Sequence, residues 1–226
     1  MSHSSDATAV ASGVEAAIEA FRRGEPVCIH DAADREGETD LIYPAGAVTP
    51  EAVARLRNDA GGLICVALGD AVAEAFDLPF LQSELDHPTA ADHDLAYDDR
   101  SSFSLPVNHR DTRTGITDED RSLTIRELAR AAETPERVDF AAEFRSPGHV
   151  HILRGAPNLL ADRQGHTELG LALAELAGVA PAVVVCEMLD DHTNEAMTPG
   201  DAAAYADSHG IPYIEGSALV ERANSL

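Results

Sequence analysis

The sequence predicts an α/β fold, in the form of a three-layer sandwich with helices packed on a β-sheet. Short apolar runs typical of strands occur at 27–29, 41–43, 63–68 and 182–186. Segments with apolar residues at helical spacing precede or separate these runs, at 9–23, 49–60, 121–129 and 166–177. Since helical and strand-like segments alternate along the chain, each helix is expected to bury its apolar stripe against the sheet.

The chain is expected to form a single domain over residues 1–226. Its 226 residues are 44% apolar, enough for a full core, and no stretch has the composition of an interdomain linker. Segment 1–8 is polar, and no run approaches the roughly 18 apolar residues that a membrane span needs. We therefore expect a cytoplasmic protein with no membrane partner. Cys28, Cys65 and Cys186 each lie in an apolar run, which indicates reduced core residues.

The charge of the chain excludes several classes of partner. Sixteen cationic residues against forty acidic ones give a net charge of −24, so neither nucleic acid nor an anionic membrane is an expected partner. All sixteen cations are arginine, and the acids are spread along the chain, a pattern that suggests a salt-adapted, halophilic organism. A melting temperature that does not rise with molar KCl would contradict this hypothesis.

The absence of lysine restricts the chemistry that the protein can perform. Without lysine, no Schiff base can form with a carbonyl substrate, and pyridoxal phosphate cannot be covalently anchored. Carbonyl chemistry in this protein would therefore need a metal.

The first two helices have clear start and stop signals. Segment 9–23 predicts a helix that ends at Gly24, and a strand follows at 27–29. Thr49 can cap a second helix, in which Pro50 takes the first position and which runs to about residue 60.

The middle of the chain is less regular. The apolar run 63–68 is too short for a buried helix and predicts a central strand, and a short helix is expected at 70–76. Segment 78–99 has no clear period and predicts a loop that can contain a mobile segment. Residues 102–107 alternate as a strand does.

The connection 109–117 contains arginines, hydroxyl groups and a glycine. Such a loop could cradle a phosphate, although a solvated loop is the favoured interpretation. Asp118, Glu119 and Asp120 precede the next predicted helix, so these acids are expected to interact with its dipole rather than with a metal.

Segment 34–40, between two predicted strands, is rich in acids. Glu36, Glu38 and Asp40 alternate along it, so in extended backbone their side chains would share one face and could hold a hard cation. Arg35 could neutralise these acids or bind an anionic substrate. A solvated acidic turn is an equally good interpretation, because acids are abundant throughout the chain.

Segment 145–153 predicts a turn that leads into a strand. His149 and His151 would lie on one face of this strand, with Val150 and Ile152 on the other. Histidines on one face could carry out acid–base chemistry. For either histidine alone, a polar strand residue that faces solvent is the favoured interpretation.

Two further positions suggest a ligand site. Gly165, His166 and Thr167 open the helix predicted at 166–177, where free backbone N–H groups and Arg163 could bind an anion and His166 could bind a metal. Glu187 follows the strand 182–186, and ligands of open α/β sheets bind at the carboxyl ends of strands.

These segments together resemble one family, 3,4-dihydroxy-2-butanone 4-phosphate synthase of riboflavin biosynthesis. The matching motifs are DREGETD at 34–40, GLIC at 62–65, TGIT at 114–117, RSPGH at 145–149, RQGHTE at 163–168 and CE at 186–187. Gly37 and Thr39 depart from the common bacterial pattern, which has asparagine and glycine there, but every charged position is kept. Bifunctional members continue into a GTP cyclohydrolase II domain, whereas this chain ends at Leu226, so we expect a monofunctional protein.

The resemblance implies a reaction and a fold. The expected activity is that of a lyase, which converts D-ribulose 5-phosphate to L-3,4-dihydroxy-2-butanone 4-phosphate and formate by enolisation, dehydration, skeletal rearrangement and loss of formate. The expected cofactor is Mg²⁺ or Mn²⁺, with no organic cofactor. The expected fold is a mixed β-sheet flanked by helices, in a homodimer whose active sites lie near the subunit interface.

The resemblance also implies roles for individual residues. His149 and Glu187 are the expected catalytic residues, and Glu36 and His166 are the expected metal ligands. The expected substrate contacts are Arg35, Glu36, Asp40, Arg163, Gln164, Gly165, His166, Thr167 and Glu187.

Two alternative functions can be separated from this one. Another metal-dependent aldolase or isomerase for sugar phosphates could use the same residue types, but it would not produce formate. A nucleotide- or RNA-binding module is disfavoured by the net charge of −24 and by the small number of aromatic residues, four tyrosines and six phenylalanines.

Overall fold

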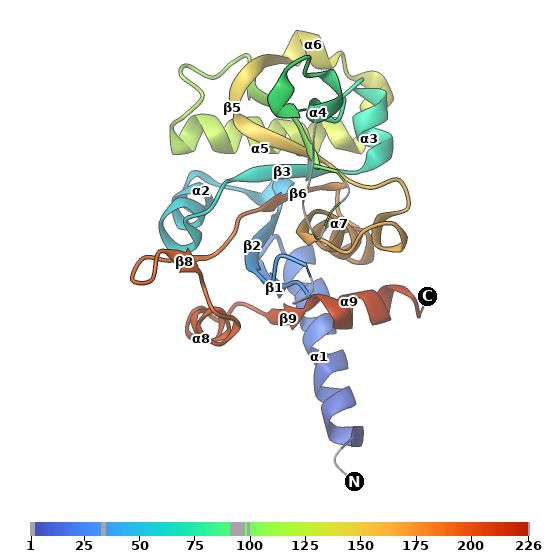
Figure 1. Ribbon diagram of the computed structural model, residues 1–226, viewed down its shortest axis with the longest axis vertical. Helices are drawn as coiled ribbons and strands as arrows, with labels where there is room; N and C mark the ends of the chain where they lie inside the picture. The colour runs from blue at the N-terminus through green and yellow to red at the C-terminus, as the bar shows by residue number, and fades with distance from the viewer. Residues whose placement is uncertain (1–2, 33–34, 91–97, 99, 226) are drawn as a thin grey trace.

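A seven-stranded sheet forms the centre of the molecule. The computed structural model describes residues 3–32, 35–90, 98 and 100–225, with side chains from residue 12 onward (Figure 1). The strands stand in the order β4-β5-β3-β6-β2-β1-β9. Their bounds are β1 Val27–His30, β2 Thr39–Pro44, β3 Cys65–Leu68, β4 Phe103–His109, β5 Phe144–Arg154, β6 Ala182–Val185 and β9 Tyr213–Glu215. The pairs β1·β9 and β3·β5 are parallel and the other pairs antiparallel, so the prediction of a mixed sheet is confirmed.

Helices cover both faces of this sheet. Their bounds are α1 His3–Arg22, α2 Pro50–Arg55, α3 Asp70–Ala75, α4 Leu81–Glu84, α5 Asp118–Glu133, α6 Phe140–Glu143, α7 His166–Ala177, α8 Pro199–His209 and α9 Gly216–Ala223. Buried residues of α1, α7 and α9 form one core, and those of α2, α3, α5 and α8 form another on the opposite face. The predicted three-layer sandwich is therefore confirmed. A separate hairpin, β7 Leu189–Asp190 and β8 Glu195–Ala196, follows β6.

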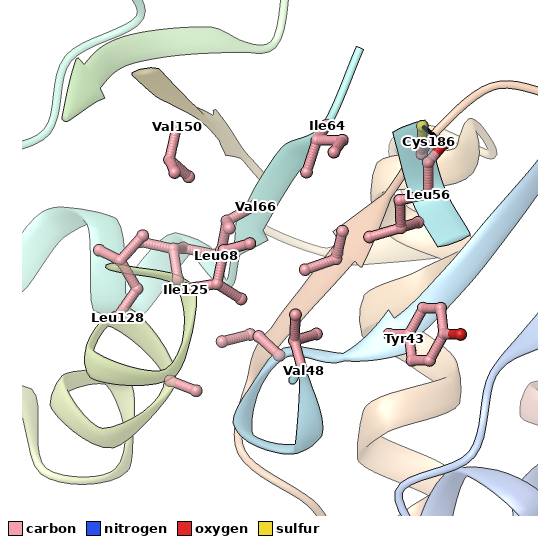
Figure 2. Packing of buried hydrophobic residues seen from close by; sticks show 14 of the residues in the cluster. Tyr43, Val48, Leu56, Ile64, Val66, Leu68, Ile125, Leu128, Val150 and Cys186 are labelled. Carbon is pink, nitrogen blue, oxygen red and sulfur yellow. Dashed lines mark hydrogen bonds between the residues drawn. The ribbon is translucent and has the colours of Figure 1, made fainter. Parts of the chain in front are cut away.

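Alternation along the strands separates the two cores. Val66 and Leu68 of β3 point to α5, where they meet Ile125 and Leu128 (Figure 2). Cys65 and Ala67 of the same strand belong to the core beneath α7. The central strands β3 and β6 are buried on both faces, so their residues form continuous apolar runs, which is why these strands were recognisable from the sequence.

Most predicted helix boundaries agree with the structure. The Thr49 hydroxyl accepts the N–H of Ala52 at 3.2 Å, as expected of a helix cap. The helix continues from α2 through a π-helical turn, Leu56–Ala60, to Gly61, whose φ of 88° reverses the chain. The first helix begins at His3, earlier than predicted, and ends near Gly24 as expected.

Three predicted boundaries were wrong. The run 63–68 becomes a strand only at Cys65, because the N–H of Leu63 turns to the Glu187 carboxylate and leaves the Leu63 side chain 42% exposed. Segment 78–99, predicted as a loop, contains α4 and a short 3₁₀ turn, Pro88–Ala90, and its residues 91–97 and 99 lie outside the described ones. The strand predicted at 102–107 extends to His109, where it pairs with Phe144 of β5.

Two other predictions concern the core and the membrane. Cys28, Cys65 and Cys186 are buried and free of disulfides, as predicted. Among the residues that the structure describes, no helix has the length and apolar character needed to cross a membrane.

Candidate active site

The predicted site residues converge at one edge of the sheet. Asp40 lies at the start of β2 and forms a bridge to Glu187, which follows β6. His166 is the first residue of α7, which begins beside the same edge. A cavity of about 150 Å³ opens here. Its lining includes six predicted site residues, Glu36, Asp40, Arg163, His166, Thr167 and Glu187.

The helix α7 approaches the sheet closely, and this places His166 in the cavity wall. A Cβ on Gly170 would lie 2.9 Å from a methyl group of Val183, so glycine permits the contact between helix and strand. Gly165, the N-cap of the helix, leaves room for the Arg163 guanidinium, whose nearest nitrogen would be 2.4 Å from a Cβ there. These two glycines fix the position of the helix start.

His166 is surrounded by carboxylates. It is 5% exposed, and its Nδ1 lies 3.5 Å from Oε2 of Glu36 and 3.4 Å from Oδ1 of Asp40. Burial lowers the pKa of His166, but Asp40, Glu36 and Asp31 more than offset this and raise it to about 9. Burial raises the pKa of the Asp40 carboxyl to about 8, although His166 acts in the opposite direction. The surrounding carboxylates therefore favour the positively charged form of the His166 ring.

The atoms around His166 fit a cation. Nε2 of His166, Oδ1 of Asp40 and Oδ2 of Asp31 are buried and have no hydrogen-bond partner among the described residues. Buried polar atoms without partners are costly, so such a group requires an explanation, and an ion is one. Ligand atoms of Asp31, Glu36 and His166 all lie within 4.8 Å of one another. Carboxylate oxygens with one imidazole suit a divalent cation such as Mg²⁺ or Mn²⁺.

The acids of segment 34–40 converge for a different reason from the one predicted. The backbone is not extended throughout, because β2 begins at Thr39 and Gly37 has a φ of 68°. Glu36 lies in the turn before this glycine and reaches His166 from there, whereas Asp40 reaches it from the strand. Asp34 lies outside the described residues. The prediction of a shared carboxylate site holds for Glu36 and Asp40, but strict strand alternation was the wrong argument.

Arg163 is held between two acids. Its Nε and Nη2 contact Oδ2 of Asp98 at 2.6 and 2.5 Å, and its Nη1 contacts Oε2 of Glu168 at 2.7 Å. Arg35, also predicted as a site residue, reaches the same Asp98 oxygen at 3.6 Å. Burial raises the pKa of Asp98, but Arg163 outweighs this and holds it below its usual value. Asp98 thus occupies the position in which an anionic substrate could bind to both Arg35 and Arg163.

Glu187 accepts hydrogen bonds from the chain that crosses its strand end. Its Oε2 accepts the N–H of Leu63 at 2.8 Å, and its backbone oxygen accepts the N–H of Gly62 at 3.0 Å. A Cβ on Gly62 would lie 2.4 Å from the Glu187 carboxylate, so only glycine leaves room for this contact. The GLIC motif therefore serves to position Glu187.

Four predicted site residues do not line the cavity: Arg35, His149, Gln164 and Gly165. Gln164 is exposed, and its Nε2 points to the backbone oxygen of Leu160 at 3.4 Å. His149 is exposed on β5 and is not part of the cavity lining. The predicted alternation around it is correct, since Val150 and Ile152 are buried while His151 is half-buried.

The connection 109–117 does not present its backbone N–H groups to a ligand. The Asp120 carboxylate accepts the N–H groups of Arg113, Thr114 and Gly115 at 3.2, 2.9 and 2.8 Å. These bonds lower the pKa of Asp120 to about 2. The donors of the possible phosphate cradle are thus used within the chain, which agrees with the favoured interpretation of a solvated loop.

A second group of potential ligands lies on the other face of the sheet. Ligand atoms of His109, Glu127 and Glu143 lie within 4.8 Å of one another. The Arg130 guanidinium bonds to both carboxylates and supplies the positive charge there. An internal ion pair accounts for this cluster without a metal.

Sequence reasoning missed Asp31 and Asp98. Asp31 directly follows β1, and its position at a strand end was an available signal. Asp98 lies in a stretch without periodicity, where the sequence offers no signal. With these two acids included, the site is a buried acidic group around one histidine, beside a small cavity and two arginines. That combination is typical of enzymes that use a divalent cation on a small anionic substrate.

Comparisons with known proteins agree with this class. The family model for 3,4-dihydroxy-2-butanone 4-phosphate synthase matches residues 15–222. The synthase of that name from Archaeoglobus fulgidus is 51% identical over 219 residues, which cover 92% of this chain and 92% of that protein. The one from Saccharomyces cerevisiae is 35% identical and covers 92% of this chain and 96% of its own length. A solved structure of such a synthase in complex with two magnesium ions aligns with a TM-score of 0.80 at 29% identity, over 94% of this chain and 96% of that one.

The chain belongs to the 3,4-dihydroxy-2-butanone 4-phosphate synthase family. It is a lyase, and the reaction converts ribulose 5-phosphate to 3,4-dihydroxy-2-butanone 4-phosphate and formate, a step of riboflavin biosynthesis. The family resemblance drawn from the sequence motifs is thereby confirmed.

Proposed function

We propose that this chain catalyses the reaction with a site in two parts, a buried cation and substrate pocket around His166 and a proton-transfer group, His149, supplied by a partner chain. The observation that carries the proposal is the set of buried atoms on Asp31, Asp40 and His166 that have no hydrogen-bond partner among the described residues. Buried polar atoms without hydrogen bonds are unfavourable, and a bound ligand that contacts them would remove this cost.

In the buried pocket, Glu36 and His166 would hold Mg²⁺ or Mn²⁺. Two protein ligands are enough, because Mg²⁺ completes its coordination with water and substrate oxygens. When bound, the cation supplies positive charge to an oxygen that becomes negative after a proton leaves the adjacent carbon. The solved relative with two magnesium ions supports a metal-dependent site of this kind. No organic cofactor is needed for this chemistry.

The substrate phosphate would bind at the start of α7. Thr167 is buried in the cavity wall, and Arg163 lies beside it. Free N–H groups and the dipole at a helix N-terminus attract an anion. Because Asp98 already occupies Nε and Nη2 of Arg163, the phosphate oxygens would replace this carboxylate. Arg35, Asp40, Gly165 and Glu187 would complete the substrate contacts, together with Glu36 and His166, whereas Gln164 is turned away.

Glu187 and His149 would move protons during turnover. Glu187 is fixed by Leu63 and faces the cavity, so it can reach a substrate held there. His149 lies outside the cavity of its own chain, which is the reason to propose a homodimer in which the partner's cavity receives it. The exposed apolar side chains of Leu63 and Ile116, at 42% and 51%, support contact with another chain.

Three further statements stay predictions. The chain would act as a single, monofunctional domain over residues 1–226, it would be cytoplasmic, and it would come from a halophilic organism. The first is supported by the single seven-stranded sheet that both cores cover, and the third by the net charge of −24 with arginine as the only cationic residue.

The experiment that tests the proposed function is incubation with ribulose 5-phosphate and Mg²⁺, with formate followed by NMR. Stoichiometric formate and 3,4-dihydroxy-2-butanone 4-phosphate are expected, and none in EDTA. Consumption of the substrate without formate would instead indicate an aldolase or isomerase.

A further inference from the structure

Asn108 makes two contacts with His149. It lies in β4, is 4% exposed, and faces the histidine across the β4·β5 pair. Its Oδ1 accepts the backbone N–H of His149 at 2.8 Å, and its Nδ2 lies 3.2 Å from the ring Nδ1. One amide group therefore binds both the backbone and the ring of the same residue.

These two contacts determine which ring nitrogen carries the proton. A backbone N–H can only donate, so the oxygen of the Asn108 amide must face it. The NH₂ group then faces Nδ1, and since it can only donate, Nδ1 must accept. In a neutral imidazole the proton then resides on Nε2.

Close packing holds the amide in place, and the hydrogen bond from the His149 N–H sets its orientation. Gly115, with a φ of 86°, approaches so closely that a Cβ there would lie 2.0 Å from Nδ2 of Asn108. A Cβ on Gly148 would lie 2.3 Å from the backbone nitrogen of Asn108. A half-turn of the amide would place NH₂ against the His149 N–H and leave two donors facing each other. Gly115 thus packs against the side chain of Asn108, and Gly148 packs against its backbone.

We propose that Asn108 is a positioning residue that keeps neutral His149 in the Nε2–H form, so that His149 donates a hydrogen bond to a substrate oxygen rather than accepting a proton at Nε2. This inference rests on the proposed role of His149 in turnover. To act as a base at Nε2, the ring would need its proton on Nδ1, where the Asn108 NH₂ group opposes it. Glu187 then becomes the group that removes a proton from the substrate.

The test is ¹⁵N NMR of the ring nitrogens of His149 in the intact protein, at a pH where the ring is neutral. The signals are assigned by their loss in His149→Gln. Wild type is expected to show a protonated Nε2 and an unprotonated Nδ1. In Asn108→Asp, which keeps the shape but offers only acceptors, the proton is expected to move to Nδ1. The opposite tautomer in wild type overturns the inference, whether or not the variant folds.

Turnover provides the second readout. Asn108→Asp is expected to lower kcat at least about tenfold, within the range of a lost acid–base or hydrogen-bond contribution, and to leave KM within about threefold. Asn224→Asp, the same change at an exposed residue after α9, is the control and should match wild type. Unchanged kcat in a folded Asn108→Asp would overturn the positioning role. Absence of formate from wild type would instead contradict the proposed function, while the NMR result would still stand.

Discussion

The surroundings of His166 and of His149 differ in almost every physical respect. His166 is 5% exposed and lies among Asp31, Glu36 and Asp40, and its Nε2 has no hydrogen-bond partner in the described part of the chain. His149 is exposed, lies outside the cavity, and is bound by a neutral amide. A buried acidic pocket concentrates charge and can bind a cation within one chain. An exposed histidine must be shielded from water, by substrate or by another chain, before it can act in a site from which water is excluded.

The difference also explains what each region costs the fold. Burying carboxylates whose oxygens are not all hydrogen-bonded destabilises the folded state, and a bound cation and substrate would offset that free energy. The exposed histidine carries no such cost, since water satisfies its Nε2–H until a partner or substrate does.

The largest expected effect is the loss of activity when the cation is removed. EDTA should abolish turnover, and Mg²⁺ or Mn²⁺ should restore it. Glu36 and His166 are only two protein ligands, so the cation is expected to bind reversibly. His166→Ala should weaken Mn²⁺ binding, measured by electron paramagnetic resonance, whereas His149→Ala should bind Mn²⁺ normally and still fail to turn over. Full activity in chelator would contradict the role of the cation. Equally weakened Mn²⁺ binding in the two variants would contradict the proposal that only the His166 region binds the metal.

Glu187→Gln should be nearly as severe for turnover but should leave folding intact. The amide oxygen can still accept the N–H of Leu63, while the amide cannot accept a proton from the substrate. We expect kcat to fall at least about 10²-fold, the lower end of a general-base contribution, with ribulose 5-phosphate still bound. Glu221→Gln on the exposed face of α9 is the matched control. Turnover within about threefold of wild type would leave Glu187 a structural residue.

Arg163 should affect binding more than chemistry. A side chain that grips phosphate acts similarly on substrate and transition state, so its loss raises KM more than it lowers kcat. Arg163→Ala alone leaves Glu168, 0% exposed, without its ion pair, which can destabilise the fold by about 3–5 kcal/mol.

For this reason the kinetic comparison should use the double variant Arg163→Ala/Glu168→Gln against Glu168→Gln. An unchanged KM between these two would show that Arg163 does not contact the phosphate.

The smallest effect concerns stability around Asp120, beside the His149 region. Its folded pKa of about 2 lies below the unfolded value of about 3.9, so its contribution is present above pH 4 and is lost as the pH falls towards 2. Urea midpoints of wild type and Asp120→Asn should differ at pH 5 and converge near pH 2. Asp191→Asn, on the exposed hairpin after β7, should show no such convergence. A constant difference across this range would mean that the carboxylate bonds to the loop are not formed.

The two regions were unequally predictable from the sequence. Local motifs placed Arg163, His166 and Thr167 together, because a helix start fixes neighbouring residues with respect to one another. Asp40 was identified in the acidic segment 34–40 and Glu187 at a strand end, although nothing in the sequence showed that they would pair across the sheet. Such contacts depend on strand order, which periodicity does not encode.

The environment of His149 could not be predicted. Asn108 lies 41 residues before His149, and the two meet only because β4 and β5 pair with a register shift at Val107 and Asn108. Asp98, similarly, meets Arg163 from a stretch with no pattern of its own. The central strands were predictable because both faces are buried. Leu63 was wrongly predicted to lie in a strand, because its N–H bonds to the Glu187 carboxylate instead of to a neighbouring strand.

The most direct test of the two-part site is a mixed dimer of two inactive variants. His149→Ala and Glu187→Gln chains, carrying different affinity tags, are refolded together and the doubly tagged species is purified. If His149 of one chain serves the cavity of the other, one of the two sites is intact, and formate production should reach about half that of wild-type dimer, as two-fold symmetry requires. A purified mixed dimer no more active than its parents would contradict the account and place both groups in one chain.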